Sequence, residues 1–172
     1  MIILGILSIV LLMFGLVVFR GAPYVPSHIG EVKGAFKELY PLSKQDTLID
    51  VGSGDGIVLR IAANQGAKAI GYEINPILVV VSWLLSLRTT RVHTYLTDFW
   101  RKDLPDETTI VYAFMVSRDV DSLAKKMQRE SDRLGKTLSL MTYGAPLKRK
   151  KVTKKRRGHH LYVFTPLQNV KA

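Results

Sequence analysis

The chain has 172 residues, of which 47% are hydrophobic and 23% charged, so most of it can fold around one sizeable core. Its formal net charge of +11 favours an anionic partner such as nucleic acid, an acidic membrane surface or an acidic protein. The absence of cysteine excludes disulfides, cysteine metal sites and thiol nucleophiles, but it leaves the compartment open.

Residues 1–19, MIILGILSIVLLMFGLVVF, carry no charged side chain. A helix of this length spans roughly 28 Å, close to the roughly 30 Å hydrocarbon thickness of a bilayer. A cleaved signal peptide fits less well, because no basic region precedes the apolar run and no A-x-A site follows it. We therefore expect a single transmembrane anchor. Every Lys and Arg follows it, beginning with Arg20, which predicts a domain on the cytoplasmic side or on the equivalent side of an organelle.

A juxtamembrane linker or lid, residues 20–30, is expected to connect the anchor to a domain over residues 31–172. Pro23 and Pro26 keep the linker extended. Ser27 is a candidate N-cap for a helix over residues 28–40.

Apolar strands alternate with helical patterns along the rest of the chain. The pattern predicts strands at 46–52, 67–73, 91–98, 108–116 and 136–143, and helices at 57–66, 76–87 and 118–135. Residues 147–166 read as two more strands, with Gly158 in the turn of an antiparallel hairpin. These elements predict a Rossmann-like α/β fold, a doubly wound and mostly parallel sheet of seven strands that ends in the hairpin and is preceded by one transmembrane helix.

The segment VGSGDG follows the first predicted strand and precedes a helix. Gly52, Gly54 and Gly56 allow close approach of the backbone to a ligand, and open α/β sheets bind ligands beyond the carboxyl ends of their strands. A P-loop is excluded, because no Gly-Lys-Ser/Thr follows. The dinucleotide fingerprint G-x-G-x-x-G also fails, since Ile57 stands where the third glycine is required.

Acidic residues around this loop indicate a cationic cofactor. Asp50 precedes the loop and Asp55 lies within it, where two carboxylates would repel a pyrophosphate and attract a positive charge. S-adenosylmethionine carries an ammonium and a sulfonium. Glu73 ends the second strand, where an acid can accept hydrogen bonds from ribose hydroxyls. Asp98 follows the third strand and could accept one from the adenine amino group.

Three motifs, DVGSGDG, YEINP and TDFW, resemble those of class I S-adenosylmethionine-dependent methyltransferases. With the apolar N-terminus and PYVPS, they resemble more narrowly the membrane-anchored protein-lysine methyltransferases of adenine nucleotide translocase and of the ATP synthase c-subunit. The resemblance implies a seven-stranded methyltransferase sheet and S-adenosyl-L-methionine as the cofactor. The residues that it places around the cofactor are Asp50, Gly52, Ser53, Gly54, Asp55, Gly56, Glu73, Ile74, Asn75, Asp98, Phe99 and Tyr24.

No catalytic residue can be assigned from the sequence. Many amino-group methyltransferases carry Asn/Asp-Pro-Pro-Tyr/Phe after the fourth strand, but this chain has YAFMVSRD there, which argues against adenine or glutamine methylation by that route. Tyr24, Ser117 and Asp119 are candidates by position only. No constellation of metal ligands is present, so no metal is expected.

The expected function is methyl transfer to a lysine of a membrane protein by a membrane-anchored enzyme. A nucleic acid, lipid or small-molecule substrate and an inactive membrane-tethered scaffold are the alternatives. Eight Lys and Arg residues lie between Lys148 and Arg157; they are expected to face anionic lipid, with nucleic acid as the rival. The target lysine, the degree of methylation and the oligomeric state stay open.

Overall fold

The computed structural model describes Gly5 and residues 28–167. The predicted anchor at 1–19, apart from Gly5, and the candidate residues Tyr24 and Ser27 lie outside this part of the chain. Within it, no helix is both long and apolar enough to cross a bilayer.

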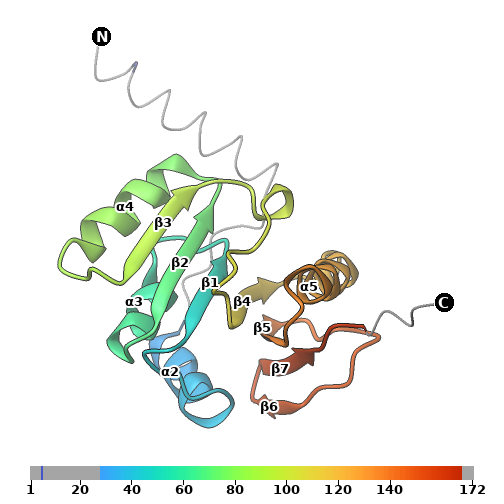
Figure 1. Ribbon diagram of the computed structural model, residues 1–172. Coiled ribbons are helices and arrows are strands. Elements are labelled where there is room, and N and C mark those ends of the chain that lie inside the picture. The colour runs from blue at the N-terminus through green and yellow to red at the C-terminus, as the bar shows by residue number, and fades with distance from the viewer. Residues whose placement is uncertain (1–4, 6–27, 168–172) are drawn as a thin grey trace.

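A single seven-stranded sheet forms the centre of the domain, in the order β3-β2-β1-β4-β5-β7-β6 (Figure 1). Its strands are β1 (Thr47–Val51), β2 (Lys68–Glu73), β3 (Val92–Leu96), β4 (Ile110–Met115), β5 (Leu138–Gly144), β6 (Lys154–Arg156) and β7 (His159–Phe164). Strands β1 to β5 pair in parallel, whereas β7 runs antiparallel to both β5 and β6. The predicted mixed, doubly wound sheet with an antiparallel end is therefore confirmed.

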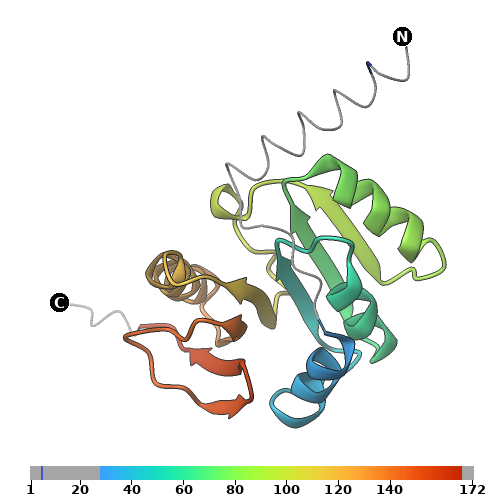
Figure 2. The ribbon, with the colours of Figure 1, turned by 180° about the vertical axis from the view of Figure 1, so that it is seen from behind.

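Helices cover both faces of this sheet (Figures 1 and 2). They are α2 (Ile29–Glu38), α3 (Ile57–Asn64), α4 (Pro76–Ser86), α5 (Val120–Leu134) and the short 3-10 helix η1 (Phe99–Arg101). One apolar cluster joins α2 and α3 to Leu48, and the other joins α5 to Ile49. Because neighbouring strand residues point to opposite faces, the two clusters fill opposite sides of the sheet.

Two local predictions differ from the structure. Helix α2 begins after His28, which occupies the N-cap position that was predicted for Ser27. The first strand of the C-terminal hairpin is only three residues long, and residues 148–153 before it form bends and irregular structure. That stretch is mostly Lys and Arg and lacks the alternating apolar residues that would anchor a longer edge strand to the core.

Candidate cofactor site

The glycine loop turns the chain from β1 into α3 with three left-handed residues. Gly52, Gly54 and Gly56 have φ values of 70°, 56° and 79°, which favour glycine. At Gly56 a Cβ would also lie 2.2 Å from the Ser82 hydroxyl of α4, whereas at Gly52 it would meet open space. Gly56 is therefore required by the close approach of the loop to Ser82 of α4, and Gly52 leaves room on the open side of the loop.

Glu73 at the end of β2 holds two loops together. Its buried carboxylate accepts hydrogen bonds from the amides of Gly54 at 2.9 Å and of Ile74 and Asn75 at 2.8 Å. A carboxylate offers about four acceptor positions, so at least one stays available for a hydroxyl such as that of a ribose. The predicted ribose acceptor thus has a second task, which is to fix the loops on either side of it.

Asp50 is a buried acid near two other carboxylates. It is 3% exposed, and no described residue donates a hydrogen bond to its carboxylate. Burial, and then the negative charges of Glu73 and Asp55, raise the pKa of Asp50 to about 8. A positively charged ligand would stabilise the ionised form of Asp50, because none of the described residues places a positive charge beside its carboxylate.

Three other predicted site residues have local structural partners. Asp55 accepts a hydrogen bond from the Ile57 amide at 3.1 Å and pairs with Arg60 at 3.3 Å. Asp98 caps η1 and Asn75 caps α4, each by accepting from the backbone amide two residues on. Arg60 offsets the charge of Asp55, so Asp50 carries more of the expected attraction for a cation than the sequence predicted.

The remaining predicted residues divide between core and surface. Phe99 is buried against Tyr72, while Ile74 is 41% exposed at the end of β2. The Ser53 hydroxyl is buried without a hydrogen-bond partner among the described residues. Of the catalytic candidates, Ser117 is exposed, and Asp119 pairs with Arg118 at 3.2 Å.

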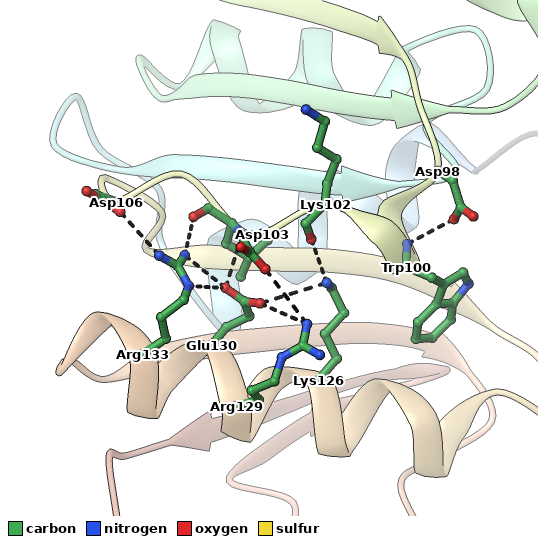
Figure 3. Close-up of polar contacts among 10 residues, drawn as sticks. Asp98, Trp100, Lys102, Asp103, Asp106, Lys126, Arg129, Glu130 and Arg133 are labelled. Atoms are coloured by element: carbon green, nitrogen blue, oxygen red, sulfur yellow. Dashed lines mark hydrogen bonds and ion pairs between the residues drawn. The ribbon is translucent and has the colours of Figure 1, made fainter.

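A buried ionic network fixes the segment that follows Asp98 (Figure 3). This network was not predicted from the sequence. Glu130 of α5 is fully buried. Its partners are the Leu104 amide at 3.1 Å, Arg129 at 3.2 Å, Arg133 at 2.9 Å and Lys126 at 3.8 Å. Burial alone would raise the pKa of Glu130, but the Leu104 amide and Arg133 hold it below its usual range. Lys126 also lies 4.9 Å from the centre of the Phe99 ring, so the network reaches η1.

A second buried polar pair lies between β4 and β7. The Tyr112 hydroxyl and His159 Nε2 are 3.1 Å apart, and burial lowers the pKa of His159 to about 4, so this ring is neutral near pH 7. Among the described residues, no group of three or more His, Asp or Glu side chains could hold a metal ion.

The site fits S-adenosylmethionine on two observations of the structure itself. They are the open space at Gly52 and the unpaired buried acid Asp50. The strand order and these carboxyl-end residues define an S-adenosylmethionine-dependent methyltransferase. The chain belongs to the methyltransferase-domain family, whose model matches residues 28–165.

Sequence comparison narrows the resemblance. The ATP synthase c-subunit lysine N-methyltransferase from Xenopus laevis is 37% identical over 114 residues, which cover 63% of this chain and 48% of that protein. The Homo sapiens protein of the same name is 34% identical over 114 residues, covering 63% of this chain and 46% of the human one. The chain therefore spans about half the length of the curated relatives it matches.

Solved structures support the fold. An RNA methyltransferase from Salinibacter ruber, in complex with S-adenosyl-L-homocysteine, superposes with a TM-score of 0.71. It is 24% identical and covers 86% of this chain and 98% of its own. The 23S rRNA methyltransferase ErmE gives a TM-score of 0.55 at 15% identity, over 70% of this chain and 48% of its own. At these identities the likeness concerns the fold alone.

Proposed function

We propose that this protein transfers a methyl group from S-adenosylmethionine to a lysine side chain of a membrane protein, with the ATP synthase c-subunit as the leading candidate. The observation that carries the proposal is the 33–37% identity to proteins named for that lysine methylation. The unpaired acid at Asp50 supports it, because it favours a cofactor with two positive charges.

The bound cofactor would supply the methyl group, and the residues of this chain would position it. The backbone of Gly52 to Gly56 would lie against the cofactor. Glu73 would accept a hydrogen bond from its ribose, and Asp50 would balance its positive charge. The lysine must be neutral to expose a lone pair, and desolvation beside a positive charge lowers its pKa. Alignment of donor and acceptor can then supply most of the rate enhancement without a dedicated base.

Labelled S-adenosylmethionine and isolated membranes test the proposal. We expect label in a small membrane protein, at lysine, and much less with Glu73→Gln as the enzyme. Label that enters RNA or lipid while protein stays unlabelled would contradict the lysine assignment. The RNA arm is included because the basic segment, residues 148–157, could also bind phosphates.

Residues 1–19 would anchor the enzyme beside this substrate, with residues 20–30 as the connecting lid and the domain on the cytoplasmic or equivalent organellar side. Tethering raises the effective concentration of enzyme at the membrane without adding contacts. Deletion of residues 1–19 should release the protein from carbonate-washed membranes and lower its activity on membrane substrate more than on a soluble peptide. A truncated protein that stayed in the pellet would contradict this role.

The basic segment 148–157 would face anionic lipid. Arg156 pairs with Glu31 and Glu38 of α2, and Arg157 pairs with Glu31. The other six basic residues form no ion pair with a described residue. Lys150 lies over the Phe164 ring and Lys154 donates to the Leu39 carbonyl, but neither side chain meets a negative charge that would compete with an anionic surface. Replacing these six by glutamate should reduce binding to anionic vesicles; if RNA binding alone were lost, nucleic acid would be the better partner.

A further inference from the structure

Exposed apolar side chains gather at one edge of the molecule. Of the twelve large hydrophobic residues exposed in the described part of the chain, eight lie from Ile74 to Leu96. Scattered exposed apolar residues are ordinary, but a contiguous group marks a surface that is normally covered. The group is centred on α4 and the adjoining edge strand β3 (Figure 1).

Helix α4 is inverted relative to a surface helix of a water-soluble protein. Its buried residues are Val79, Ser82 and Ser86, so both of its serines face the sheet. Its exposed residues include Leu85, at 54%, and a set at helical spacing that runs on into the C-cap: Val80, Trp83, Leu84 and Leu87, which are 48%, 53%, 61% and 77% exposed. We call these four residues the apolar α4 face. A surface helix normally buries its apolar stripe and exposes its polar one, so this helix is built for an apolar surrounding on its outer side.

Two of the three polar side chains of α4 are hydrogen-bonded to β3, whereas the Ser86 hydroxyl is buried on the inner side without a partner among the described residues. The Ser82 hydroxyl bonds to that of Thr94 at 2.7 Å, and the Trp83 indole N–H donates to the Thr94 carbonyl at 2.8 Å. Trp83 therefore presents an apolar ring outward while its N–H is already satisfied by β3. Satisfied polar groups are what a hydrocarbon environment demands, because no water is there to replace them.

We propose that the apolar α4 face docks into the interfacial layer of a lipid bilayer. A protein partner would normally meet a polar rim with hydrogen-bonding groups, but residues 76–87 contain no charge at all. Arg88 and Arg91, both exposed, follow the helix directly and can pair with lipid phosphates. The 19 uncharged residues at the start of the chain are long enough to span a bilayer. Their insertion would place the domain, and with it α4, close to the membrane surface. The docking does not depend on the identity of the methyl acceptor.

This contact is separate from the basic segment. Strands β3 and β6 are the two edges of the sheet, so α4 and residues 148–157 lie on opposite sides of the molecule (Figures 1 and 2). A flat bilayer can contact both the apolar α4 face and the basic segment only when the line across the sheet from β3 to β6 runs parallel to the membrane.

Tryptophan fluorescence of the full chain in vesicles tests the proposal directly, because the chain has only two tryptophans. Trp100→Phe leaves Trp83 as the reporter. Trp83→Phe leaves Trp100 as the matched control; it packs edge-on against Phe99 and lies near α5 (Figure 3). The vesicles contain phosphatidylcholine brominated in its acyl chains and phosphatidylserine. We expect brominated lipid to quench Trp83 strongly and Trp100 weakly, while iodide in the water quenches Trp83 little.

Three results would overturn the proposal. Free quenching of Trp83 by iodide, with no effect of brominated lipid, would show that the face is in water. Protection from both quenchers would show that a second copy or another part of the chain covers it. Equal quenching of both tryptophans by lipid would show no preference for this face. Leu84→Asp in the Trp83 reporter should lose most of the lipid quenching while the heat of S-adenosylhomocysteine binding stays unchanged, which separates a failure to dock from a failure to fold.

Discussion

Asp50→Asn should stabilise the cofactor-free protein and weaken its affinity for S-adenosylmethionine. The pKa of Asp50 rises from 3.8 to about 8 on folding, first through burial and then through Glu73 and Asp55. Between these pH values the folded protein holds a proton that the unfolded chain has released. The contribution of Asp50 to the free energy of unfolding is therefore most favourable below about pH 4 and falls by about 1.4 kcal/mol per pH unit until about pH 8.

The size of the effect follows from that shift. At pH 7 this one carboxyl lowers the free energy of unfolding by up to about 4 kcal/mol, a large part of the 5–15 kcal/mol typical of a domain. Asparagine keeps the shape of the protonated acid and cannot ionise. We expect wild type and Asp50→Asn to be equally stable near pH 4, and the variant to be more stable by a few kcal/mol at pH 8.

The cofactor reverses this order. A bound cation favours the ionised carboxylate, so binding should release a proton and the affinity of wild type should rise between pH 6 and pH 8. Urea unfolding at pH 4 and pH 8 measures the first effect. Calorimetric titration in two buffers of different ionisation enthalpy counts the released proton. Equal stability of the two proteins at pH 8, or an affinity of wild type that does not change with pH, would refute this account of Asp50.

Three further substitutions test the rest of the site. Glu73→Gln should weaken cofactor binding by about 1–3 kcal/mol in calorimetry, because one of the three backbone amides that donate hydrogen bonds to Glu73 would lose its acceptor. Gly56→Ala should unfold at lower urea than Gly52→Ala, since both have positive φ but only the first would place a Cβ against Ser82; the reverse order would contradict the packing argument. Glu130→Gln should cost about 3–5 kcal/mol of folding stability and also weaken cofactor binding, whereas Asp103→Asn, at an exposed ion pair, should change stability by less than about 1 kcal/mol.

Local patterns in the sequence predict much of this molecule. The glycine loop, the order of strands and helices and the acids at strand ends follow from short-range spacing, which a single sequence displays. Side-chain pairs between residues that are not neighbours in the sequence could not be predicted in this way. Nothing near Asp55 indicates that Arg60 would offset its charge, and Glu130 lies 26 residues from the Leu104 amide that it accepts.

The outward orientation of the apolar side chains of α4 could not be predicted from the sequence, for a different reason. Residues 76–87 read simply as an apolar helix, and an apolar helix can be buried on every side. Only the packing of Ser82 against Thr94 shows which side faces the sheet, and hence that the larger apolar side chains face outward. The direction of a uniformly apolar helix is set by its tertiary neighbours, which periodicity does not report.

The three hydrogen bonds to Glu73 have a consequence for the timing of cofactor exchange. They fix the glycine loop and the turn after β2 before any ligand arrives. A site ordered in advance needs no slow closing step at this loop, so association should be fast and nearly the same for cofactor and product. The difference in residence between S-adenosylmethionine and S-adenosylhomocysteine would then lie in their dissociation rates, where affinity differences between related ligands usually reside.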